Sequence, residues 1–244
     1  MNRITYVSLF MSIMVLLCQC SKPTDIKVVI YDNRFLNALI KQGVDTDGDS
    51  TISTAEAKAV KSLDISNYYS YEDIYDVTGI EAFINLTKLF CGSNLIRSLD
   101  VSNIIGLEEL ACENNKLTRL DVSKNVALKS LYCYSNQLTS LDVSKNVVLK
   151  SLYCSGNDLT HLEITNNVAL KYLDCHMNEL TDLDASKNLD TLICDSNDIT
   201  NLDFSRNTDL KYLSCIGNQL TTVDISNNTS LEYLNCNTNL LSSL

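Results

Sequence analysis

This sequence has few of the residues on which catalytic and nucleotide-binding sites depend. Its 244 residues include one proline, no tryptophan and two histidines, His161 and His176. Because the two histidines stand at unrelated positions, they do not form a zinc motif. There is also no glycine-rich phosphate loop and no nucleophile elbow, so the sequence offers little support for an enzyme.

Positive charge is also scarce. Lysine and arginine total 19 against 30 aspartates and glutamates, which gives a net charge of -11. An acidic chain repels nucleic acid and anionic membrane surfaces, so neither is an expected partner. The length suits one folded body, since domains typically contain about 100–200 residues. What the sequence does contain is ten cysteines, eight of which recur at a nearly constant interval.

A 21-residue unit repeats from Leu86 to the end of the sequence. Its pattern is L-x-x-L-x-C-x-x-N-x-L-x-x-L-D-V-S-x-N-x-x, and only the step from Leu170 to Leu189 is shorter, by two residues. The first leucines of the units are Leu86, Leu107, Leu128, Leu149, Leu170, Leu189, Leu210 and Leu231. The cysteines are Cys91, Cys112, Cys133, Cys154, Cys175, Cys194, Cys215 and Cys236. The asparagines are Asn94, Asn115, Asn136, Asn157, Asn178, Asn197, Asn218 and Asn239.

The spacing within the unit predicts how one unit folds. A leucine and a cysteine two residues apart point to the same side of a short strand. One unit cannot bury that side alone, but stacked units bury it against each other. Each asparagine follows its strand where the chain turns, and its side chain can bond backbone groups that would otherwise be buried without partners. A second, similar pattern ten residues later predicts a second extended segment across the core.

This pattern is the leucine-rich-repeat signature with cysteine in place of the third leucine. The nested 21-residue form resembles the leucine-rich-repeat surface lipoproteins of Bacteroidetes-type gut bacteria, over roughly residues 20–244. The resemblance implies a mostly β solenoid with short parallel strands, little convex helix and a small α-helical N-terminal cap. It implies little about function, because such repeats host many partners. We assign residues 86–244 to the solenoid, as eight repeats of which the last is incomplete, and residues 32–85 to the cap.

Residues 1–20 have a different character from the rest of the chain. A short basic start precedes an apolar run from Ile4 to Leu17, and Cys18, Gln19 and Cys20 follow. This ending resembles the lipobox of bacterial lipoproteins, which implies lipidation of Cys20, with Cys18 as the alternative. An ordinary signal peptide is the other interpretation. Lipidation would hold an exported protein at the outer membrane or cell surface without spanning it, with residues 21–31 as a tether. Whether the protein faces the periplasm or the outside stays open.

The cap contains an acidic loop, residues 45–56, that resembles the calcium loop of EF-hand proteins. The resemblance implies a structural Ca²⁺ site whose ligands are Asp45, Asp47, Asp49, Thr51, Ser53 and Glu56. Two departures are Ser50, where glycine normally makes the sharp turn, and the lack of a second EF-hand. The alternative is a solvated acidic turn that starts a helix. Apolar spacing predicts flanking helices at Asn33–Gln42 and Thr54–Ser62.

Eight regularly spaced cysteines in an exported protein raise the question of disulfides. Stacked units place neighbouring cysteines about 4.8 Å apart with parallel side chains. A disulfide needs Cβ atoms about 3.8 Å apart and a near-right-angle twist between them. We therefore predict free, buried thiols that pack as small hydrophobic groups.

The outward positions of the cysteine-containing strand form the predicted binding face. Its candidate ligand-binding residues are Tyr132, Tyr134, Tyr153, Tyr172, Asp174, His176, Tyr212 and Tyr233. Tyr132 and Tyr153 occupy the same position in adjacent units, so their rings should be neighbours. Tyrosines are typical of recognition surfaces, but they are also ordinary strand residues. The outward column of the second half is acidic, and we interpret it as a solvated face.

We therefore predict a non-catalytic binding module, extracellular or periplasmic, that recognises an unknown protein or glycan through its strand face. The alternatives are a structural spacer or truncated repeat array without a ligand, and an enzyme that uses His176 with Asp174 or Asp195. The last repeat stops before its second half, which should leave Leu234, Cys236 and Leu241 partly open. Truncation, or self-association through this coil, would account for the open end.

Overall fold

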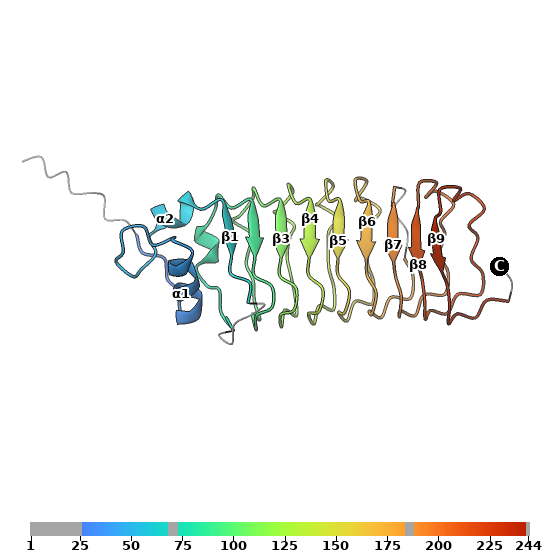
Figure 1. Ribbon diagram of the computed structural model, residues 1–244, viewed down its shortest axis with the longest axis horizontal. Coiled ribbons are helices and arrows are strands. Elements are labelled where there is room, and N and C mark those ends of the chain that lie inside the picture. Colours follow the sequence, from blue (N-terminus) through green and yellow to red (C-terminus); the bar gives the residue numbers. More distant parts are fainter. Residues whose placement is uncertain (1–25, 68–72, 184–187, 243–244) are drawn as a thin grey trace, which may run out of the picture.

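The computed structural model describes residues 26–67, 73–183 and 188–242, which form a cap and a rod of stacked coils (Figure 1). Cys18 and Cys20, the candidate lipidation residues, lie outside the described residues. In Figure 1 the parallel strands follow one another along the rod in sequence order, with the helices at the N-terminal end. The strands are β1 (Ser62–Asp64), β2 (Lys88–Phe90), β3 (Glu109–Ala111), β4 (Ser130–Tyr132), β5 (Ser151–Tyr153), β6 (Tyr172–Asp174), β7 (Thr191–Ile193), β8 (Tyr212–Ser214) and β9 (Tyr233–Asn235).

The strands pair in the register that the repeat predicts. The central leucine of each strand lies beside the central leucine of the next, as Leu131 lies beside Leu152. The short step keeps this register, since Leu173 pairs with Leu192, because the two missing residues fall outside the strands. These central leucines are buried, and the residues on either side of them are partly exposed in most strands. The predicted fold, a mostly β solenoid with few helices, is confirmed.

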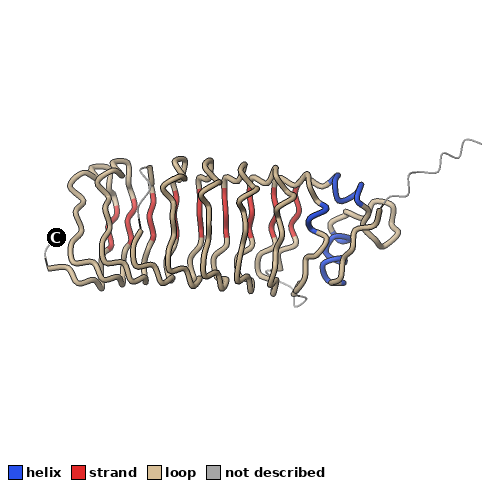
Figure 2. The backbone as a smooth tube through the Cα atoms, turned by 180° about the vertical axis from the view of Figure 1, so that it is seen from behind, coloured by secondary structure: helices blue, strands red, loops and turns tan. Residues whose placement is uncertain are grey.

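The second half of each coil differs from the prediction. Within the described residues it forms no strand, and Figure 2 shows it as a run of loops behind the sheet. In one coil Asp121 Oδ1 accepts the N–H of Ser123 at 2.9 Å, and Asn125 N–H donates to Val122 O at 3.0 Å. Because these local turns engage the backbone groups, the segment cannot pair as a strand.

The acidic column of the second half takes part in these turns. In each described coil the acidic side chain accepts the N–H of the serine or threonine two residues later, and the pKa of the carboxyl is lowered chiefly by hydrogen bonds from that residue. The residues concerned are Asp100, Asp121, Asp142, Glu163, Asp203 and Asp224. The column therefore forms turns at an exposed edge.

The asparagine that follows each of the strands β2–β9 joins its own coil to the preceding one. The Asn157 Nδ2 donates to the carbonyl oxygens of Cys154 at 3.0 Å and Ser155 at 3.3 Å in its own coil. It also donates to Cys133 O of the preceding coil at 3.1 Å, while Oδ1 accepts Leu138 N–H at 3.0 Å. The side chain is 7% exposed, so these partners replace water. The predicted role of this column is confirmed.

A second asparagine column crosses the back of the rod. The Asn146 Nδ2 donates to Val122 O at 3.1 Å and to Asn125 O at 2.9 Å, both in the preceding coil. Asn167 repeats this arrangement with Val143 and Asn146. Coils that carry both asparagines are therefore tied to their predecessor at two points, one after the strand and one before the next strand, whereas Ile104 takes the second position in the coil of Asn94.

The cap covers the first coil with two helices. Helix α1 (Asn33–Lys41) is capped at its N-terminus by Asp32, whose Oδ1 accepts the Arg34 N–H at 2.8 Å. The helix buries Phe35 and Leu39. Helix α2 (Thr54–Ala59) is shorter than predicted, because Val60 is extended and the chain enters β1. A 3₁₀ turn, η1 (Ile80–Ala82), precedes β2. The segment assigned to the cap thus supplies the first strand of the sheet.

Cysteines form a continuous column inside the rod. The seven from Cys91 to Cys215 are buried, Cys236 is partly exposed, and all eight are free thiols. Burial, with a smaller contribution from Glu113, raises the pKa of Cys133 to about 12, so its thiol stays protonated at neutral pH. In the last described coil Leu231, Leu234 and Leu241 are only partly buried, whereas the corresponding leucines of earlier coils are enclosed.

Replacing Asn157 by alanine should destabilise the rod. The substitution removes four hydrogen bonds and leaves buried backbone groups of two coils without partners, at about 2–4 kcal/mol in the free energy of unfolding. Urea denaturation followed by circular dichroism measures the loss. The control is Asn166→Ala, at an exposed position on the back turn, which should cost less than about 0.5 kcal/mol. Equal losses in the two variants would contradict the role of the asparagine column.

The thiols should differ in reactivity along the column. Iodoacetamide at pH 8 should modify Cys236 in the folded chain and leave the seven buried cysteines unmodified, since burial excludes the reagent and keeps the thiols protonated. After unfolding without a reductant, all eight should react. Peptide mass spectrometry measures both results, and a disulfide between any two of these cysteines would contradict the prediction.

Candidate functional site

Tyrosine rings stack along the exposed side of the sheet. The ring centroids of Tyr132 and Tyr153 are 4.6 Å apart with an interplanar angle of 14°, as the shared repeat position predicts. Tyr172 continues this stack, 4.6 Å from Tyr153 at 29°. Sequence reasoning missed that contact, because Tyr172 begins its strand whereas Tyr153 ends its own. Only the reach of a tyrosine ring across the strand diagonal brings the two together.

A second stack lies nearer the C-terminal end. Tyr212 and Tyr233 pair in register on β8 and β9, with centroids 4.3 Å apart and an interplanar angle of 6°. In both stacks the ring faces cover one another. Because stacked rings hide their faces, the surface offered to a ligand consists mainly of ring edges and hydroxyl groups.

The hydroxyls of Tyr153 and Tyr172 in the first stack remain protonated to higher pH than that of a free tyrosine. Burial, followed by electrostatic coupling to Tyr153 and Asp174, raises the pKa of Tyr172 to about 12. Burial also raises the pKa of Tyr153, with Tyr132 and Asp174 adding to the effect. These hydroxyls can therefore donate hydrogen bonds to a ligand at neutral pH.

The other predicted ligand-binding residues lie at the carboxyl ends of the strands. Asp174 Oδ1 lies 2.6 Å from His176 Nδ1 and also accepts the His176 N–H at 3.2 Å. Tyr134 follows the end of β4. Burial and then Glu113 raise the pKa of Tyr134. The structure thus brings Asp174 and His176 together.

Asp195, a member of the alternative enzyme site, contacts the next coil. Its Oδ1 accepts the Ser214 hydroxyl and the Ile216 N–H, both at 2.7 Å. This carboxylate therefore links β7 and β8.

The acidic loop gathers three of the predicted calcium ligands. One carboxylate oxygen from each of Asp45, Asp47 and Asp49 lies within 4.8 Å of the others. Asp45 Oδ1 also accepts the Gly48 N–H at 2.8 Å, which curls the loop around this group. Ser50 has a φ of 63°, the left-handed conformation for which glycine is usual, so serine here adopts the expected sharp turn. Three convergent carboxylates at alternate positions fit a hard cation.

Glu56 lies outside this group and closes the loop with hydrogen bonds. Its Oε1 accepts Thr46 N–H at 2.6 Å, and its Oε2 accepts Ser53 N–H at 2.9 Å. Although burial opposes it, these donors and the hydroxyls of Thr46 and Ser53 lower the pKa of Glu56 to about 2. Ser53 accepts the Glu56 N–H in return, so the two residues form a capping box for α2. Both predicted ligands therefore have a structural role without an ion.

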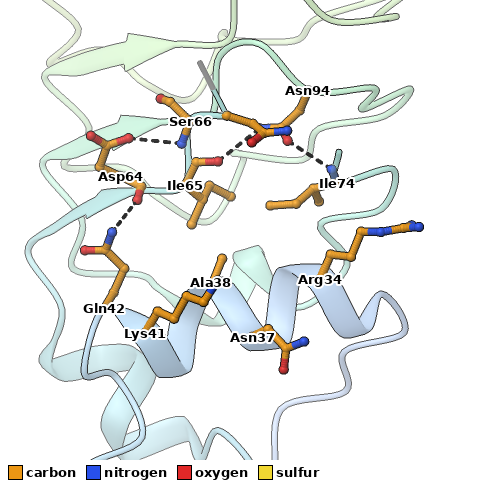
Figure 3. A pocket seen from close by; sticks show the side chains of 11 residues that line it. Arg34, Asn37, Ala38, Lys41, Gln42, Asp64, Ile65, Ser66, Ile74 and Asn94 are labelled. Carbon is orange, nitrogen blue, oxygen red and sulfur yellow. Dashed lines mark hydrogen bonds between the residues drawn. The ribbon is translucent and has the colours of Figure 1, made fainter. Parts of the chain in front are cut away.

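A cleft of about 190 Å³ lies where α1 meets the first coils (Figure 3). Gln42 Nε2 donates to Asp64 O at 2.7 Å on one side. On the other side Asn94 Oδ1 accepts Ile74 N–H at 2.9 Å and Nδ2 donates to Ile65 O at 3.0 Å. These contacts join the cap to the sheet, so the cleft marks a structural junction.

Comparison with solved structures identifies the architecture. The functional domain of InlJ from Listeria monocytogenes, which includes a cysteine ladder, is 38% identical, with a TM-score of 0.68 over 87% of this chain and 52% of the solved domain. The leucine-rich-repeat protein LIC12759 of Leptospira interrogans is 25% identical, with a TM-score of 0.68 over 75% of this chain and 50% of its own. The fold is a leucine-rich-repeat solenoid. The chain spans about half the length of these two proteins.

A more distant leucine-rich-repeat solenoid is a plant receptor. The ectodomain of the kinase GASSHO1/SCHENGEN3 from Arabidopsis thaliana, solved in complex with Casparian strip integrity factor 2, has a TM-score of 0.66. It is 21% identical over 77% of this chain and 25% of its own. No protein-family model and no curated protein matched the chain. Within residues 26–67, 73–183 and 188–242, no helix is long and apolar enough to cross a membrane.

The contribution of Glu56 to stability should depend on pH. Because its pKa is lowered on folding, its stabilising effect is complete above the ordinary value of 4.5 and is lost as pH falls toward 2. Wild type should therefore be more stable than Glu56→Gln at pH 6, and the difference should narrow steadily between pH 5 and pH 2. Urea midpoints measured at each pH test this, and a constant difference would contradict it.

Proposed function

We propose that this chain is a non-catalytic binding module that recognises a protein partner through the exposed face of strands β4–β9. The observation that carries the proposal is the pair of tyrosine stacks on that face. Stacking orders the rings in the free protein, so little side-chain entropy is lost when a partner docks on them. Tyrosine supplies apolar area and a polar tip together, a combination enriched at protein interfaces.

The ring geometry favours a protein over a glycan as the partner. A sugar ring recognised by stacking needs an open aromatic face, and Tyr153 is covered by a ring on either side, so only the end rings of the stacks keep one face open. The row of hydroxyls and ring edges suits the hydrogen-bonding groups and side chains of a protein surface. The leucine-rich-repeat ectodomain solved with Casparian strip integrity factor 2 gives a precedent for the fold as a scaffold of protein recognition.

We further propose that the protein is exported and lipid-anchored through Cys20. The support is the sequence alone, in the apolar run before this cysteine. A single acyl chain holds a protein only marginally, so stable anchoring needs more than one chain. The tether predicted at residues 21–31 would then be shorter, because Val28 N–H donates to Ile52 O at 2.7 Å and Val28 and Ile30 pack against the core of the cap. The tyrosine face would remain open to other proteins.

We also propose a structural Ca²⁺ site in the loop 45–56. Asp45, Asp47 and Asp49 would supply its carboxylate ligands, and their close approach supports the proposal. The ion would offset repulsion among three like charges. Its role would be to stiffen the connection between α1 and α2, which cover the first coil.

The proposed binding face can be tested with matched variants. We expect a screen of displayed extracellular proteins, run beside a glycan array, to yield a protein that binds wild type. The variant Y132S/Y153S should weaken that binding at least about tenfold, and Y132F/Y153F should weaken it less, because it keeps the stack and loses only hydroxyls.

The control is T139S/T160S, which alters an exposed edge away from the sheet and should bind like wild type. Binding that survives in Y132S/Y153S would contradict the proposed face. Binding to glycans and to no protein would contradict a protein partner and indicate a glycan ligand. Binding to neither array would favour a structural spacer.

Calcium should raise the thermal stability of the chain. Addition of 1 mM Ca²⁺ should raise the melting temperature by roughly 2–4 °C for each kcal/mol of stabilisation. The variant D45A/D49A should lose this shift, whereas D209A, which removes an exposed aspartate of the solenoid, should retain it. Differential scanning fluorimetry measures the three responses, and an unchanged melting temperature in wild type would contradict the site.

A further inference from the structure

The two tyrosine stacks are separated by a single strand. Tyr172 closes one stack and Tyr212 opens the other. The sheet register pairs Tyr172 with Thr191, and Thr191 with Tyr212. Thr191 therefore stands between two aromatic positions and contributes a small side chain where its neighbours contribute rings.

The backbone spacing across Thr191 corresponds to a stack from which one member is missing. Rings within the stacks have centroids 4.3–4.6 Å apart, close to the usual strand spacing of about 4.8 Å. Two strand spacings separate the backbones of Tyr172 and Tyr212, or about 9.6 Å. A planar group above Thr191 would then lie at about stacking distance from each ring. The ring faces that Tyr153 and Tyr233 leave uncovered are the ones on this side.

Negative charge is close to the two flanking rings. Asp174 follows Tyr172 by two residues, and Asp195 lies at the carboxyl end of β7 beyond Thr191. Burial and then Tyr153 and Asp174 raise the pKa of Tyr172. The pKa of Tyr212 is raised by burial and then by its interactions with Tyr233 and Asp195. The carboxylates thus act electrostatically on both hydroxyls and favour a positively charged guest.

The lysines nearby lie at the amino ends of the strands, and His176 Nδ1 lies 2.6 Å from Asp174 Oδ1 at the carboxyl end. Lys171 and Lys211 each precede one of the rings at the amino ends of the strands. Lys171 Nζ lies 3.1 Å from Asp190 Oδ1, so its charge is already paired. The acidic groups Asp174 and Asp195 lie at the opposite, carboxyl end.

We infer that the position above Thr191, between the rings of Tyr172 and Tyr212, accepts the guanidinium group of an arginine on the protein partner. This inference rests on the proposed function and specifies the partner as a protein with an exposed arginine. A guanidinium is planar, positively charged and weakly hydrated, so it can stack on an aromatic face on each side. A lysine ammonium has the charge without the plane, and a neutral ring has the plane without the charge.

The test separates charge from planarity with three small probes. They are N-acetyl-arginine amide, N-acetyl-lysine amide and N-acetyl-citrulline amide, of which the last keeps the flat shape and lacks the charge. The full chain carries ¹³C-labelled tyrosine rings, and single tyrosine-to-phenylalanine variants assign the signals. The arginine probe should shift the Tyr172 and Tyr212 signals saturably, leave Tyr132 unchanged, and bind roughly tenfold more tightly than the other two.

Matched variants place the response at Thr191. T191Y puts a ring into the position and should abolish the response to arginine, with a melting temperature near that of wild type. T160Y adds a ring on an exposed edge outside the sheet and should keep the response. Should T191Y not fold, Y212S provides the second test, since it removes one of the two flanking rings and should weaken arginine binding at least tenfold.

Three results would overturn the inference. They are an equal response to citrulline, shifts spread evenly over all five stacked rings, and a full response in T191Y. These results are distinguishable from failure of the proposed function. A protein partner that loses binding in Y132S/Y153S but not in T191Y would support the face and overturn the arginine position. Saturable arginine binding in a chain that captures no protein would support the arginine position and overturn the proposed protein-binding face.

Discussion

The stacking of coils depends on the buried asparagine that follows each strand. A turn at the end of a buried strand leaves backbone carbonyl and N–H groups with no water to bond. The amide of Asn157 meets this need in two coils at once, because Nδ2 bonds carbonyls of both and Oδ1 accepts an N–H of the preceding coil. The same side chain therefore shapes its own turn and fixes the register of its neighbour.

The other columns of the repeat follow from that stacking. With coils held at strand spacing, the inner position before the turn is buried, and cysteine fills it as a small apolar group. The acidic residue of the second half bonds a backbone N–H two residues later, as Asp121 does with Ser123. This hydrogen bond forms an exposed turn, in which the backbone N–H is bonded locally and does not pair with a neighbouring strand. Local turns at the back and a continuous sheet at the front are thus two results of one repeat.

Because the buried positions are fixed by the repeat, variation is confined to the outward side chains. Among these, the tyrosines stack on one another, and the stack breaks at Thr191. The fold thus converts a periodic chain into an ordered surface with one irregular position. A protein partner that uses the tyrosine face would find its most distinctive feature at this break.

The sequence by itself determined the solenoid, its register, the buried thiols and the tie made by Asn157, since each follows from residue type at a fixed period. It also predicted that Tyr132 and Tyr153 are neighbours. It failed for the second half-repeat and for the end of α2, where local hydrogen bonds and the entry into β1 outweigh the apolar pattern. Only the tertiary structure decided that Tyr172 reaches diagonally to Tyr153 and that Glu56 bonds Thr46 and Ser53. The reason is physical: a repeat fixes where each Cα lies, whereas the direction of a long side chain depends on the neighbours that surround it.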